Sequence, residues 1–199
     1  MAISLPRWVA FLAVAAVVVA EAATPRQDAD LLRQKVAAIV EFGTLTRPAG
    51  QPRRTTLTES ELNAYLTLDA TKDLPAGVVE PSLSILGPGR LSGRAVVDLD
   101  AVRRQQPPQG LLDPRRLLVG RLPVTASGVL QTANGVARFS LESAAVGGIP
   151  MPKAVLQEIL GYYTRSAERP EGLNMDDPFA LPSNIREIHV DRGQAVVIQ

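Results

Sequence analysis

The sequence predicts an α+β domain in which a long, strongly curved antiparallel sheet wraps around a helix from the C-terminal half, with another helix near the N-terminus. Three observations predict this class. Residues 117–146 read as one long hairpin, residues 27–42 and 151–166 show the spacing of amphipathic helices, and a second hairpin closes the chain. Because the sheet and the later helix each carry an apolar face, the helix should lie in the concavity of the sheet.

The composition narrows the class of protein further. The chain has 199 residues, a formal net charge of +1, one histidine and no cysteine. Without cysteine this sequence can form no disulfide, no thiolate metal site and no lipidated cysteine. A net charge so close to zero, with no basic stripe and few aromatic residues, gives no reason to expect nucleic acid as a partner.

Residues 1–22 have the pattern of a signal peptide. Arg7 precedes an apolar run from Trp8 to Ala20, and Ala20-Glu21-Ala22 offers a small-x-small cleavage site. The run is shorter than the roughly 20 residues that a membrane span needs. We therefore expect export to the periplasm or another extracytoplasmic space, with cleavage after Ala22 or Ala23 and residues 23–199 forming one domain. The alternative is that the segment stays attached as a tether.

Two helices are predicted in the first third of the chain. Residues 27–42 place Leu32, Val36, Ile39 and Val40 on one stripe. A capping box follows, with Thr58 as N-cap residue and Glu61 three positions later, and it starts a short helix. Asn63 on that helix either contacts a ligand or bonds to backbone as a structural residue.

Two strands should follow, over residues 78–86 and 90–100. Pro81 makes the first an edge or bulged strand, because proline has no N–H to donate. The second alternates clearly, with Leu91, Gly93, Ala95, Val97 and Leu99 on one face. Prolines then interrupt residues 102–116, and this segment is expected either to touch a membrane surface or to form a solvated loop. The basic residues that would make the membrane contact are Arg103, Arg104, Arg115 and Arg116.

The long hairpin has the most specific local signal. Asn134-Gly135 favours a type I′ turn, and a two-residue loop makes every opposed pair sum to 269 in residue number. Leu130 then faces Phe139, Gly128 faces Leu141, and Ala126 faces Ser143. This register puts the even positions of the first strand and the odd positions of the second on one apolar face. Gly120, Pro123 and Gly128 are the expected bends or bulges.

The C-terminal part continues with a helix over residues 151–166, a polar loop over 167–184 and a hairpin over 185–199. The apolar stripe of the helix consists of Val155, Leu156, Ile159, Leu160 and Tyr163. His189 falls on the outer face of the last hairpin. With that lone histidine, and with no nucleophile, phosphate-binding or metal motif in the sequence, we expect neither an enzyme nor a bound metal or cofactor.

The order of elements and three stretches of sequence carry a family resemblance. The stretches are LTESELNAYL at 57–66, RLSGRAVVDLD at 90–100 and the closing hairpin of valines and isoleucines. Together they resemble the tubular lipid-binding (TULIP-like) domains of bacterial envelopes, and are most similar to the YceB-like lipoproteins and LmeA-like periplasmic proteins. YceB-like proteins carry a lipidated cysteine, which this chain lacks.

The resemblance implies an apolar groove between sheet and helix that binds a lipid, fatty-acyl or other hydrophobic ligand. The residues expected to line it are Leu99, Leu122, Val124, Ala126, Leu141, Val155, Ile159 and Tyr163. The small residues on the inner face leave room for a chain, but they also allow a helix to pack closely. The alternative function is therefore a structural or partner-binding envelope domain with a filled core and no ligand.

Overall fold

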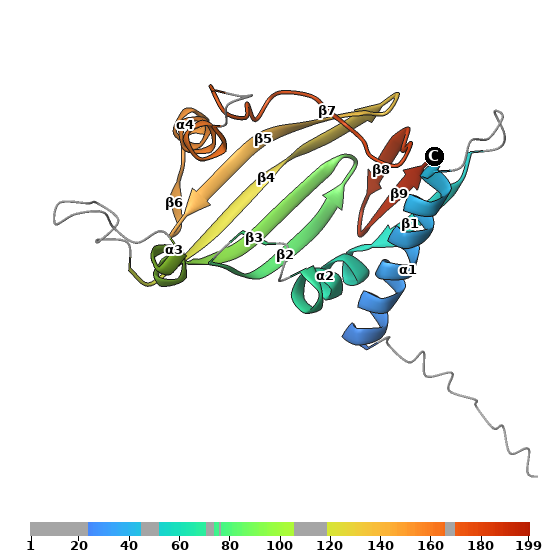
Figure 1. Cartoon of the computed structure of the whole chain (residues 1–199), viewed down its shortest axis with the longest axis horizontal. Coiled ribbons are helices and arrows are strands. Elements are labelled where there is room, and N and C mark those ends of the chain that lie inside the picture. Colours follow the sequence, from blue (N-terminus) through green and yellow to red (C-terminus); the bar gives the residue numbers. More distant parts are fainter. Residues whose placement is uncertain (1–23, 45–51, 71–73, 76, 106–118, 166–169) are drawn as a thin grey trace, which may run out of the picture.

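The computed structural model describes residues 24–44, 52–70, 74–75, 77–105, 119–165 and 170–199 (Figure 1). Within them the fold is α+β, with four helices, a large antiparallel sheet and a smaller one. The predicted fold class is confirmed, although the curved sheet does not close on itself. The expected signal peptide lies outside the described residues.

The large sheet has the strand order β2-β3-β4-β5-β6, and β7 also pairs with β5. Its strands are β2 (Val78–Gly87), β3 (Arg90–Asp98), β4 (Arg121–Ala133), β5 (Val136–Val146), β6 (Ile149–Pro150) and β7 (Phe179–Ala180). The small sheet has the order β1-β9-β8, formed by β1 (Arg54–Thr58), β8 (Glu187–Asp191) and β9 (Gln194–Ile198). The helices are α1 (Pro25–Thr44), α2 (Glu59–Leu68), α3 (Leu99–Gln105) and α4 (Lys153–Thr164).

The β4–β5 hairpin has the predicted turn. Asn134 and Gly135 both have positive φ, at 51° and 79°, as a type I′ turn requires. From Ala133–Val136 to Gly128–Leu141 the pairs follow the predicted register, and Leu130 lies opposite Phe139. Both of these side chains are half-buried.

Beyond Gly128 the register shifts by one residue. Ser127 pairs with Ser143 and Ala126 with Ala144, so the predicted pairing of Ala126 with Ser143 is wrong. The cause is a bulge that leaves Glu142 without a partner on β4, and an extra residue moves every later side chain of β5 to the other face. Of the three expected irregular positions, Gly128 is the one beside this bulge.

Strand β2 confirms the prediction from Pro81. It is the edge strand of the large sheet, and its register against β3 shifts between Val79 and Ser82. Within this bulge Glu80 has a positive φ of 52°. The irregularity lets an edge strand carry a proline without breaking a regular ladder.

Residues 99–105 differ from the prediction. Leu99 and Asp100 do not continue β3 but begin helix α3, which extends into the segment expected to be a loop. Asp98 accepts a hydrogen bond from the backbone N–H of Ala101 at 2.9 Å, in the manner of an N-cap residue. The Asp98 carboxylate therefore ends the strand and starts the helix.

Helix α2 joins the two sheets. The capping box between Thr58 and Glu61 is formed as predicted. Asn63 has the structural role: its side chain donates to the Leu83 carbonyl and accepts from the Leu83 N–H, both at 2.7 Å. Glu59 accepts from the Ile85 N–H at 2.6 Å. These bonds hold α2 against the edge of β2.

The described core lies where the small sheet meets one end of the large one. One cluster contains Ile39, Ile185 and Val197, and a second contains Ile85, Val190 and Ala195. Helix α1 buries Leu32 and Ile39 as predicted, but Val36 and Val40 are 43% and 49% exposed. The predicted stripe was therefore too wide, because only one side of it is buried, where α1 packs against α2 and the small sheet.

Helix α4 packs against β5 (Figure 1). Its residue Val155 is 41% exposed. None of the helices in the described part of the chain combines the length and apolar character that a membrane crossing requires.

Candidate functional site

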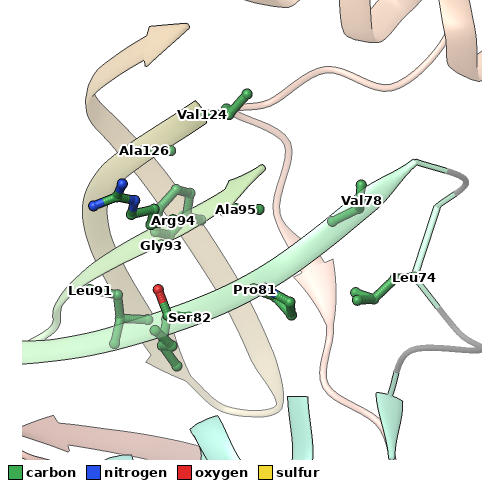
Figure 2. A pocket seen from close by; sticks show the side chains of 12 residues that line it. Leu74, Val78, Pro81, Ser82, Leu91, Gly93, Arg94, Ala95, Val124 and Ala126 are labelled. Atoms are coloured by element: carbon green, nitrogen blue, oxygen red, sulfur yellow. The ribbon is translucent and has the colours of Figure 1, made fainter. Parts of the chain in front are cut away.

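The inner face of the large sheet, which carries Ala126, holds an open depression of about 410 Å³ (Figure 2). We call it the groove. Its lining comes from β2, β3, β4 and β5 and from the short segment before β2. The apolar residues that form its walls are Leu74, Val78, Pro81, Leu83, Leu91, Val124 and Phe139. The walls of the groove are therefore formed by hydrocarbon side chains.

The floor of the groove is made of small residues. Gly93 lies opposite Ala126 in the β3–β4 register, and Ala95 lies opposite Val124. A Cβ atom at Gly93 would come no closer than 4.0 Å to any heavy atom, so the space above this residue is empty. A strand pair with small inward residues produces a hollow where larger residues would fill the face.

Ser82 and Arg94 are the polar members of the lining. Arg94 lies between Gly93 and Ala95 on β3, and it pairs with Ser82 on β2 and Thr125 on β4. Successive side chains of a strand point to opposite faces, so the Arg94 guanidinium projects away from the groove. The residues described here thus give the groove no charged group to bind a headgroup.

Two of the predicted ligand-binding residues, Val124 and Ala126, line the groove. Leu122 and Leu141 occupy inward positions on the same face. Leu122 lies on β4 two residues before Val124, and Leu141 lies on β5 opposite Gly128, two residues after Ala126. Leu99 is the first residue of α3, and Val155 is exposed on α4. The side chains of Ile159 and Tyr163 lie outside the description. That all eight residues contact one ligand stays a prediction.

The contribution of β2 to the groove was not predicted from the sequence. Val78, Pro81 and Leu83 line the groove, yet none was a candidate. The sequence signal for it was the Gly87-Pro88-Gly89 turn, which joins β2 to β3 in a hairpin. In this hairpin Leu83 pairs with Gly93 and Val78 with Val97, on the apolar face of β3. The bulge at Pro81 obscured it, since the alternation of β2 does not continue through that residue.

Other groups that can carry chemistry lie away from the groove. His189 is exposed on the outer face, where its Nε2 lies 2.7 Å from a carboxylate oxygen of Glu187. No cluster of three or more metal-binding side chains occurs among the described residues. Arg103 bonds to Asp100 at 2.9 Å and Arg104 is exposed, while Arg115 and Arg116 lie outside the described residues.

Comparison with known proteins leaves the family undetermined. No protein family matches the sequence, and no curated protein matches it either. Among solved structures, a crystal structure of a lipopolysaccharide binding protein aligns at 17% identity with a TM-score of 0.24. The alignment covers 78% of this chain and 45% of that one, so this chain spans less than half of that protein. A TM-score this low does not establish a shared fold, and the resemblance to tubular lipid-binding domains stays a prediction.

Proposed function

We propose that this domain binds a hydrophobic ligand, such as the acyl chain of a lipid, in the groove on the inner face of the large sheet. The observation that carries the proposal is an open, apolar hollow of about 410 Å³ outside the described core. Small-molecule sites are concave, mainly apolar and roughly 300–1,000 Å³ in volume. The groove lies within this range.

The chemistry of the lining favours hydrocarbon over a polar ligand. Each methylene moved from water into apolar surroundings contributes about 0.8 kcal/mol, so a chain that fills the groove gains several kcal/mol. A polar ligand would lose hydrogen bonds to water and find few partners among these side chains. Binding without catalysis is the activity that this lining supports.

The proposed location is the periplasm or another extracytoplasmic space, supported by the signal-peptide pattern of residues 1–22. Sequencing of the mature N-terminus should start at Ala23 or Thr24. An intact Met1 in a cytoplasmic fraction would contradict export.

Arg104, exposed on α3, is the described residue most suited to the proposed contact with an anionic membrane surface. Its replacement by Gln should weaken co-sedimentation with anionic vesicles but not with neutral ones.

The groove is tested by blocking it with Ala126→Trp. Ala126 lies in the floor, so an indole there would occupy the space for the ligand. The matched control is Thr125→Trp, since Thr125 is the preceding residue of the same strand and is exposed on the opposite face. The readouts are saturable binding of a fluorescent fatty acid and the thermal midpoint of each protein.

We expect binding by the wild type and by Thr125→Trp, and loss of binding in a folded Ala126→Trp variant. A wild type that binds no fatty acid or phospholipid, and releases none into organic solvent, would contradict the proposal. The filled, partner-binding domain would then be the better account. In that case Ala126→Trp should only overpack the fold, at about 1–3 kcal/mol.

A further inference from the structure

One end of the groove is closed by the ring of Phe139. Phe139 pairs with Leu130, two residues nearer the hairpin tip than Gly128. Its ring nevertheless reaches back over Gly128, because a Cβ atom there would lie 2.6 Å from the ring Cζ and would also overlap the Ser140 carbonyl oxygen. The ring thus occupies the place that a side chain at residue 128 would take. Glycine is the residue that permits this close approach.

Behind this ring the sheet belongs to the core. Leu130 and Leu91 pack against the cluster of Ile85, Val190 and Ala195. Leu91 also lines the groove and pairs with Gly128, so it stands beside the ring at the same level of the sheet. To pass this point, a hydrocarbon chain would have to displace half-buried side chains that pack against the core. We call Phe139 and Leu91 the end wall.

At its other end the groove is bounded by Leu74, Val78 and Val124. There the apolar inner face continues to the pair Val97 and Leu122, and both residues are only half-buried. The groove therefore has a blocked end at the core and a less covered end away from it. A chain bound along β3 and β4 would place its terminal methyl group against the end wall.

We infer that Phe139 determines the length of hydrocarbon chain that the groove accepts, an inference that rests on the proposed function. Each methylene buried in front of the ring should raise affinity about fourfold, the equivalent of roughly 0.8 kcal/mol. Once the chain reaches the ring, further methylenes stay in water and add nothing. Affinity should therefore rise with chain length and then reach a plateau.

The test uses a homologous series of straight-chain fatty acids below their micelle concentrations, each competing with a bound fluorescent fatty acid. Replacing Phe139 by Ala opens the blocked end by up to one two-residue step of β4, roughly 6–7 Å. The plateau should move to longer chains, with a roughly tenfold or greater gain in affinity for chains longer than the wild-type limit. Shorter chains should bind as they do to the wild type.

Two further variants keep the result interpretable. Phe179→Ala is the matched control, because Phe179 is 50% exposed on β7 and lies outside the lining. It should leave the plateau unchanged. Phe139→Leu removes part of the ring but keeps an apolar side chain, and it replaces Phe139→Ala if that variant does not fold. Its plateau should move in the same direction by a smaller amount.

The outcomes separate the inference from the function on which it rests. A wild type that binds fatty acids with no plateau, or a plateau that stays in place in folded Phe139 variants, would overturn the role of Phe139 and leave ligand binding intact. A shift in Phe179→Ala equal to that in the Phe139 variants would also overturn it. If the wild type binds no member of the series, the proposed function fails, and the inference fails with it.

Discussion

Replacing Lys35 by Met should destabilise the fold strongly, because it would leave Glu61 buried without its cation. Glu61 is 6% exposed, and its two carboxylate oxygens lie 2.6 and 2.7 Å from the Lys35 ammonium. The same ammonium donates to the Thr56 carbonyl at 2.7 Å. Lys35 lies on α1 and Glu61 on α2, so this pair joins the two helices at the small sheet.

The magnitude follows from what each group keeps after the change. Breaking a buried ion pair by removing one partner costs about 3–5 kcal/mol. Glu61 would retain the hydrogen bond from the Thr58 N–H at 3.1 Å, and the Lys35 side chain is 29% exposed, so water can partly replace it. Both facts favour the lower end, near 3 kcal/mol. That is a large share of the 5–15 kcal/mol that typically stabilises a domain.

The assay is urea denaturation, with the midpoint and slope measured for each variant. The matched control is Lys153→Met, because Lys153 pairs with Asp176 on the surface, where the two side chains are 44% and 53% exposed. An exposed pair of this kind contributes about 0–1 kcal/mol. Adding Glu61→Leu to Lys35→Met should recover part of the loss, since it removes the unpaired charge. A loss in Lys35→Met no larger than in Lys153→Met would refute the reasoning.

Two further substitutions test the turn and the β2 edge. Gly135→Val should lower stability by at least about 1–2 kcal/mol in the same denaturation assay, because a β-branched residue is strained at a φ of 79°. An unchanged midpoint would contradict the type I′ turn. Asn63→Ala should cost about 1–3 kcal/mol, because it removes both hydrogen bonds to Leu83. Thr67→Ala, at an exposed position one turn later on α2, is its control, and equal losses in the two would contradict the role of Asn63.

Elements with a strong local signal were predictable from the sequence. The capping box at Thr58 and the Asn134-Gly135 turn each depend on a few adjacent residues, and both form as expected. Pro81 also predicted correctly that its strand is an edge or bulged strand, because a residue without an N–H group cannot donate to a regular ladder wherever the strand lies in the fold. In each case the physical constraint acts within one turn or one strand.

Features that depend on distant partners were not predictable in the same way. The bulge at Glu142 is invisible in the alternation of β5, since both registers place apolar residues inward on part of the strand. Leu99 fits the alternation of β3 equally well, and only the bond between Asp98 and Ala101 shows that a helix begins there. Val36 and Val40 match a helical stripe, but the tertiary packing of α1 leaves them exposed, and the spacing of apolar residues alone does not show which of them find a partner.

For the candidate site, the sequence predicted which face of the sheet carries it but not where the groove ends. The inner face of β4 was identified from its even positions, and Val124 and Ala126 line the groove. The end wall was missed, because the reach of the Phe139 ring over Gly128 depends on a side-chain direction that alternation does not specify.

The bonds from α2 to β2 also affect how copies of this protein can associate. An edge strand normally offers free N–H and C=O groups on which another chain can add a strand, and this is a route to aggregation. Here Asn63 satisfies both groups of Leu83, Glu59 takes the Ile85 N–H, and the Gly193 N–H bonds to the Ile85 carbonyl at 3.0 Å. Pro81 interrupts the same edge farther along. Strand addition at β2 would require α2 to detach first, so the edge beside the groove is a poor template for fibril growth even though the groove itself is apolar.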